Sequence, residues 1–196
     1  MIVRALCFFT TLILSAACNN QNKSYDKVYF DFDSLINVQV NVLAKAELTL
    51  TKSVSLDGKN DQSSHATDST LVAQELDVFR QLDLINKPLY RNMYEVTDGE
   101  KDNQSNLSIR RYKAKTPAPV AFVTFYYHKD FKQIKKIESV YHETNSLYAS
   151  KRQLQLEFDD SSGAMLLSKY KMTGSQKMIL SDSVKFTIEA SFAPTY

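Results

Sequence analysis

The chain has few of the residues on which small secreted domains and many enzymes depend. Of its 196 residues, two are cysteines, four are glycines and four are prolines, and there is no tryptophan. So few glycines leave little material for phosphate-binding loops, and no Gly-x-Ser-x-Gly nucleophile motif occurs. The only cysteines are Cys7 and Cys18, both near the start, so a domain formed by the rest must be stabilised by its core without disulfides.

The net charge argues against a nucleic-acid-binding surface, and the scattered histidines argue against a metal site or a catalytic site. The chain has 24 basic and 22 acidic residues, a net charge of +2, so no basic surface for nucleic acid is expected. His65, His128 and His142 stand singly in different predicted elements, while His142-Glu143 and Asp159-Asp160 end two predicted strands. Polar residues are expected at such ends. We therefore predict a non-enzymatic protein with no metal site and no cofactor.

The first 18 residues carry the clearest pattern in the chain. Arg4 precedes an apolar run over residues 5–14, and the small residues 15–17 lead to Cys18. These three parts predict a signal peptide over residues 1–17. The run is too short to span a bilayer as a permanent helix.

The end of this segment resembles the lipobox of bacterial lipoproteins. The resemblance implies that Cys18 becomes the first mature residue and carries acyl chains, several of which hold a protein on a bilayer far more firmly than one. Ser15 stands where an aliphatic residue is usual, with Leu14 one step further back. Ser15 and Ala17 also suit ordinary signal peptidase, which would leave a free thiol, and a buried N-terminal helix is a third reading. We favour acylation, and with it the cell envelope and its outer membrane.

The next part of the chain is predicted to contain a tether, two helices and a loop. Residues 29–50 have both helical and alternating periodicity, and we favour a helix to about Lys45, capped by Asp31 or Asp33. The following elements are a strand over 48–56, a turn at Asp57-Gly58, an exposed loop over 59–70, and a helix over 70–84 that is capped by Asp68 or Ser69 and stopped by Pro88. We divide the whole chain into signal peptide, flexible tether and single domain: 1–17, 18–28 and 29–196.

From residue 89 on, short alternating stretches replace the helical pattern. The predicted strands are 89–96, 107–115, 120–127, 133–142, 147–158, 164–172 and 178–192. Turns are predicted at Asp98-Gly99, Thr116-Pro117, Asn145-Ser146, residues 161–163 and Thr173-Gly174. Short connections favour antiparallel neighbours. The predicted fold is α+β, a curved antiparallel meander of about seven or eight strands with the two N-terminal helices packed on one face.

Several segments of the mature chain are similar to uncharacterised envelope lipoproteins of the Bacteroidota. The family pattern joins a lipobox and a helical segment to an Asp-x-Ile-Asn-Lys-Pro element and a long β region that ends in Gly-x-Gln-Lys. Residues 83–88 match the first element, and Gly174, Gln176 and Lys177 match the second. The tryptophan often found before the second helix is missing. The resemblance implies the compartment and the fold, and it brings no assigned activity.

Aromatic residues supply the remaining functional clue. There are eleven tyrosines and eleven phenylalanines, and Phe122, Phe125, Tyr126 and Tyr127 crowd the most apolar predicted strand. Cross-strand packing explains such a cluster most simply. The alternative is an apolar surface for a ligand or partner. We expect an envelope interaction module that contacts the bilayer through acylated Cys18 and binds an envelope protein; the alternative function is a carrier or sensor of a lipid, with a cavity beneath residues 120–127.

Overall fold

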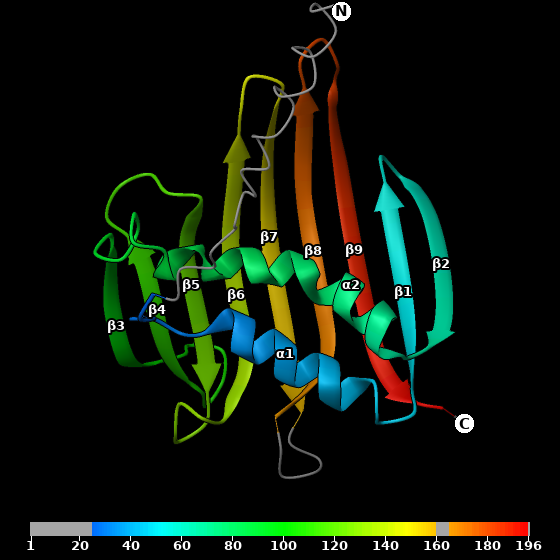
Figure 1. Cartoon of the computed structure of the whole chain (residues 1–196), viewed down its shortest axis with the longest axis horizontal. Coiled ribbons are helices and arrows are strands. Elements are labelled where there is room, and N and C mark those ends of the chain that lie inside the picture. Colours follow the sequence, from blue (N-terminus) through cyan, green and yellow to red (C-terminus); the bar gives the residue numbers. More distant parts are fainter. Residues whose placement is uncertain (1–24, 160–164, 196) are drawn as a thin grey trace, which may run out of the picture.

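The computed structural model describes residues 25–159 and 165–195, and within them the chain folds as nine strands and two α-helices. The predicted α+β class is confirmed, with nine strands where seven or eight were expected (Figure 1). In chain order the elements are α1 (Phe32–Leu43), β1 (Leu48–Leu56), β2 (Lys59–Ala66), α2 (Ser69–Arg80), the 3-10 helix η1 (Gln81–Asn86), β3 (Tyr94–Lys101), β4 (Ser108–Ala114), β5 (Val120–Tyr127), β6 (Ile134–Thr144), β7 (Tyr148–Asp159), β8 (Leu166–Met178) and β9 (Ser183–Pro194).

The strands form one antiparallel sheet in the order β2-β1-β9-β8-β7-β6-β5-β4-β3. Strands β3 to β9 are neighbours in chain order, as short connections require. The β1–β2 hairpin pairs with β9, so β2 and β3 lie at opposite edges although they follow one another in the sequence. The chain must therefore cross the whole sheet between them, and α2 with η1 makes this crossing in front of the strands (Figure 1).

Both helices are capped by an aspartate, Asp31 and Asp68, in each case one of the two residues that the sequence predicted. The Asp31 carboxylate accepts a hydrogen bond from the backbone N–H of Ser34 at 2.9 Å, and the Asp68 carboxylate accepts one from Leu71 at 2.8 Å. The buried residues of α1 recur at helical spacing: Phe32, Leu35, Ile36, Gln39 and Leu43. The helices pack on each other and on one face of the sheet, here named the helix-covered face; the other is the open face.

Strand β2 corrects the loop predicted over residues 59–70. Its sequence, KNDQSSHA, is polar and almost wholly exposed, yet it pairs with β1 from Leu56↔Lys59 to Thr49↔Ala66. The hairpin turn is the predicted Asp57-Gly58, with φ of 46° and 83°, which matches the two-residue turns that suit twisted strands. An exposed edge strand has no apolar face, so its side chains carry no strand signal.

Two predicted glycine turns are wrong because both glycines lie inside strands. Gly99, with φ of 85°, sits at a register shift between Asp98 and Glu100 in β3, where it makes a bulge. Gly174 lies in β8 beneath the ring of Phe186. A Cβ atom there would lie 2.4 Å from the carbonyl oxygen of Lys151, so close strand packing explains this glycine.

Several element boundaries also differ from the prediction. The expected strand over 89–96 begins only at Tyr94, because turns follow Pro88. Strand β8 continues to Met178, so the expected strand over 178–192 begins at Ser183. The expected helix over 70–84 is α2 followed by η1. Among the described residues, no helix is both long and apolar enough to cross a membrane.

Candidate functional site

The four aromatic residues predicted as one surface lie on both faces of β5. Phe125 and Tyr127 point to the helix-covered face and are buried, whereas Phe122 and Tyr126 lie on the open face and are half-buried. This division follows from the alternation of side chains along a strand. The structure therefore does not bring the quartet together, and each face requires its own account.

On the helix-covered face, Phe125 is the centre of an aromatic cluster. Its ring centroid lies 4.9 Å from that of Phe30, 5.2 Å from those of Tyr112 and Phe131, and 6.1 Å from that of Phe32. Phe125 itself is 0% exposed. Rings from residues 30–32, from β4 and from the β5–β6 connection thus fill the space beneath β5 where a carrier would need its cavity.

The two tyrosines of the quartet are held by carboxylates. The Tyr127 hydroxyl donates to Asp98 at 2.8 Å, and the Tyr126 hydroxyl donates to Glu138 at 2.8 Å. Burial, together with Glu138, raises the pKa of Tyr126 to about 12. Both hydroxyls are therefore neutral near pH 7 and serve as fixed donors.

An open groove of about 1000 Å³ lies on the open face, between β4, β5 and β6. Phe122 and Ala121 form part of its apolar lining, and a register shift between Val120 and Phe122 places Ala121 at a bulge. Bulges commonly re-aim side chains next to binding sites. The rest of the lining is Arg111, Lys113, Ala114, Lys115, Thr116, Pro117, Ala118, Pro119, His142 and Thr144.

The connection that makes one wall of the groove is fixed at both ends. The backbone N–H of Lys115 donates to the carbonyl of Met93 at 2.8 Å, and the carbonyl of Pro119 accepts from the N–H of His142 at 2.7 Å. The connection contains Pro117 and Pro119, and the proline ring restricts the backbone angle φ of each to about −65°. A wall of this kind is formed before any ligand arrives, so binding does not have to order it.

The groove is basic as well as apolar. Arg111, Lys113 and Lys115 carry positive charge, and no aspartate or glutamate is among the lining residues. Arg111 donates to Thr124 at 3.1 Å, whereas Lys113 and Lys115 have no ion pair within residues 25–159 and 165–195. The nearest carboxylate in the strand register is Glu95 of β3, which is opposite Lys113 and exposed. Two unpaired ammonium groups beside an apolar lining suit an anionic ligand with an apolar part.

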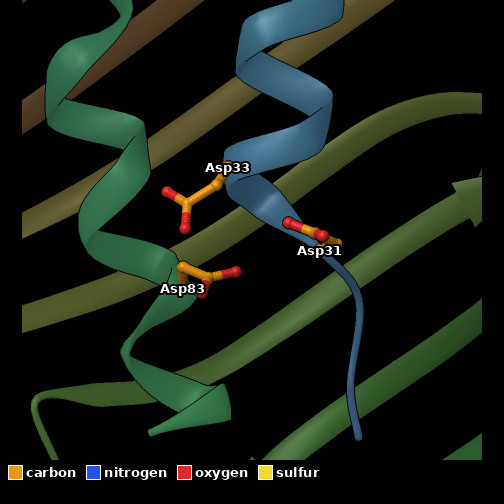
Figure 2. Close-up of side chains that lie close together, drawn as sticks. All are labelled: Asp31, Asp33 and Asp83. Atoms are coloured by element: carbon orange, nitrogen blue, oxygen red, sulfur yellow. The ribbon is translucent and has the colours of Figure 1, made fainter. Parts of the chain in front are cut away.

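A second cluster of charged groups joins the chain before α1 to η1. Figure 2 shows the carboxylates of Asp31, Asp33 and Asp83 turned toward the space between the helices, and one oxygen from each lies within 4.8 Å of the other two. Three carboxylates could hold a divalent cation. In this protein the Nζ atom of Lys27 lies 2.5, 3.0 and 2.9 Å from them, so a lysine ammonium already occupies the position between the carboxylates and offsets part of their charge.

Asp83 is the buried member of this cluster and uses both of its oxygens. Oδ1 accepts from the backbone N–H of Phe32 at 3.1 Å and from the amide of Asn86 at 3.1 Å, and Oδ2 faces Lys27. Burial raises the pKa of Asp83 above its usual range, and the hydrogen bonds from Lys27 and Asn86 oppose that rise. These contacts make the cluster a clamp on the N-terminal segment, which attaches part of the predicted tether to the domain.

Sequence reasoning missed most of the groove. Of its lining residues, Phe122 had drawn attention as a possible apolar contact, His142 as a strand end and Thr116-Pro117 as a turn. A usable signal was present in Arg111-x-Lys113-x-Lys115, which puts three cations on one side of a strand, followed by the stiff Pro-Ala-Pro segment. The other two histidines lie elsewhere, His65 in β2 and His128 after β5.

Cys18, the predicted acylation site, lies outside the described residues. The chain was also compared with known proteins. No family model matches it, and neither a curated protein nor a solved structure does.

Proposed function

We propose that this protein is a membrane-anchored, non-enzymatic envelope lipoprotein whose domain binds an anionic amphiphile in the open-face groove. The main support for this proposal is the composition of the groove, in which the apolar residues Ala121 and Phe122 lie next to the unpaired cations Lys113 and Lys115. The anchor is Cys18, as the lipobox resemblance implies. The resemblance of residues 83–88 and of Gly174, Gln176 and Lys177 suggests kinship with the Bacteroidota envelope lipoproteins.

The chemistry of the groove favours one class of ligand. A purely apolar ligand would leave the ammonium groups of Lys113 and Lys115 without a counter-charge, and a small inorganic anion would leave Phe122 without a contact. A molecule that joins a phosphate or carboxylate to an acyl chain satisfies both. The volume of about 1000 Å³ is at the upper end of the range for small-molecule sites, so a single-chain amphiphile fits.

The alternative function, a carrier of a lipid, was expected to hold its ligand in a cavity beneath residues 120–127, and it would need another site. A cavity beneath residues 120–127 is incompatible with Phe125, which is fully buried among four aromatic rings. The open-face groove could hold a hydrophobic ligand only with part of it in contact with water. A sensor or binder of an exposed amphiphile is therefore favoured over a carrier that encloses its cargo.

The groove is tested by calorimetric titration of residues 19–196 with dodecyl phosphate below its micelle concentration. Replacing Lys113 and Lys115 together by glutamine is expected to weaken binding roughly tenfold, equivalent to about 1.4 kcal/mol, because the phosphate loses its counter-charge. Phe122→Ala is expected to weaken binding by a similar factor, because the alkyl chain loses its main contact.

A charge-matched control removes two lysines that lie away from the groove. Lys45→Gln with Lys132→Gln changes the net charge equally, and both side chains are exposed. The control should bind like the wild-type protein. Equal weakening in the control, or no weakening in the groove variants, would show that the phosphate is attracted by overall charge or binds elsewhere.

The anchor is tested by mass spectrometry of the N-terminal peptide from protein made in its own envelope. Acyl chains on Cys18 are expected, and Cys18→Ala should move the protein from the membrane fraction to the soluble fraction, because the chains that bind the bilayer are lost. An unmodified N-terminal cysteine would instead indicate ordinary signal cleavage.

A further inference from the structure

Large apolar side chains are exposed together at one end of the sheet. Leu147 in the β6–β7 connection is 62% exposed, and Met178, Ile179 and Leu180 at the β8–β9 connection are 52%, 61% and 100% exposed. The backbone N–H of Ile179 donates to the carbonyl of Leu147 at 2.8 Å, which joins the two connections. Figure 1 shows them side by side, beyond the helices. These four residues are named the apolar tip.

Leu180 is unusual in both exposure and backbone conformation. Its φ is 65°, in the left-handed region that glycine and asparagine adopt readily and a leucine does not. Because the side chain is fully exposed, it adds nothing to the core. Neither the turn nor the folded interior accounts for a leucine at this position, and its apolar side chain is free for a contact outside the chain.

Three lysines lie on the open face next to the apolar tip. Lys177 directly precedes Met178, and the register places Lys151 of β7 and Lys185 of β9 both opposite Ser175 of β8. All three side chains are exposed, and none has an ion pair among the described residues. Three carboxylates of the described residues also lie at this end: Asp182 in the β8–β9 connection, Glu143, which lies 3.5 Å from Arg152, and Asp57, which accepts from the backbone N–H of Lys185 at 2.8 Å. None of the three forms an ion pair with the three lysines, so the lysine ammonium groups can contact an anionic partner.

We propose that the apolar tip inserts into the interfacial layer of an anionic lipid bilayer, with Lys151, Lys177 and Lys185 at the headgroup phosphates. Apolar side chains among acyl chains, with cations above them, are the arrangement of proteins that bind at membrane surfaces. Protein interfaces are depleted in lysine, and the apolar tip protrudes from the sheet, so lipid is favoured over a protein partner. The inference rests on the proposed function in one respect, because acylated Cys18 brings the domain to the bilayer.

The absence of tryptophan makes a direct test possible. Leu180→Trp places the only tryptophan at the apolar tip, and Lys132→Trp places it in the exposed β5–β6 connection at the other end of the sheet. Each full chain, processed and acylated in its own envelope, is reconstituted into vesicles of brominated phosphatidylcholine with 30% phosphatidylglycerol. The expected result is strong bromine quenching and a shorter emission wavelength for Leu180→Trp, and neither for Lys132→Trp. If Leu180→Trp disturbs the turn, Ile179→Trp provides the same measurement.

Two further variants test the physical basis of docking. Lys177→Gln in the Leu180→Trp chain should lower the ratio of docked to undocked domain about fivefold, the contribution of one lysine near an anionic surface. Leu180→Asn, read through Ile179→Trp, should fold at least as well as the parent chain because asparagine tolerates the left-handed turn, and should show much weaker quenching.

Several outcomes would overturn the proposal. These are equal quenching of the two single-tryptophan chains, quenching of neither, or crosslinking of the apolar tip to a protein while the lipid leaves it unquenched. These results would refute membrane insertion by the apolar tip without refuting the proposed function, which is tested by separate measurements. The anchor is judged separately by the mass of Cys18, and the groove by its affinity for dodecyl phosphate.

Discussion

Phe125→Ala is expected to destabilise the domain by about 3–5 kcal/mol, the usual cost of truncating a fully buried phenylalanine. The side chain is 0% exposed, and four aromatic rings that surround it come from three separate parts of the chain. Residues 30–32 are held by the clamp to η1, so the rings cannot easily close the resulting cavity. Thermal unfolding followed by circular dichroism should show a midpoint lower by on the order of 10 °C.

Phe122→Ala provides a matched control on the same strand. It removes the same side chain from the open face, where Phe122 is half-buried beside the groove. Its effect on the unfolding midpoint should be much smaller, while its effect on dodecyl phosphate binding should be larger. If the two variants unfold at the same temperature, the assignment of the two faces of β5 is wrong.

The elements that were predicted correctly carry strong local signals. Strand β5 has the predicted bounds because its run of β-branched and aromatic residues, VAFVTFYY, has strong strand propensity over its whole length. Asp31 and Asp68 were each one of two predicted cap candidates, because a short polar side chain before an apolar period is the usual start of a helix. Each of these signals lies within a few residues and does not depend on distant contacts.

The features that were missed depend on the partner strand or on remote segments. Strand β2 exists because β1 supplies hydrogen-bond partners, and Gly174 is required by the carbonyl of Lys151 and the ring of Phe186. Gln39 is 1% exposed because its amide bonds the backbone of Met165 and Leu167, more than 120 residues away. No local pattern encodes contacts of this kind.

The candidate site was likewise only partly predictable, because its residues come from segments that are distant in the sequence. The sequence drew attention to Phe122 because aromatic residues cluster around it, but the neighbours that give it a chemical environment come from β4, from the connection to β5 and from β6. Alternation alone would have separated Phe122 from Phe125. It could not show that His142 and Lys113 line the same groove on either side of β5, because that requires the order of strands in the sheet.

Asp83→Ala is expected to cost about 3 kcal/mol, because it removes the one buried carboxylate that joins the N-terminal segment to η1. The backbone N–H of Phe32 and the amide of Asn86 would lose an acceptor, and Lys27 would lose the most buried of its three partners. Lys27 remains partly exposed, so water can replace some of its lost interactions. That exposure keeps the expected cost at the lower end of the range for broken buried pairs.

Two further variants separate the charge of Asp83 from its shape. Asp83→Asn keeps an acceptor for Phe32 and removes the negative charge, so it should cost less than Asp83→Ala. Asp77→Ala removes a carboxylate from α2 that is 76% exposed and lies 3.7 Å from Arg80, and such pairs contribute roughly 0–1 kcal/mol. Urea unfolding should therefore rank the midpoints with Asp77→Ala nearest to wild type, Asp83→Asn next and Asp83→Ala lowest. If Asp83→Ala and Asp77→Ala unfold at the same urea concentration, the N-terminal segment is held by the aromatic contacts of Phe30 and Phe32 alone.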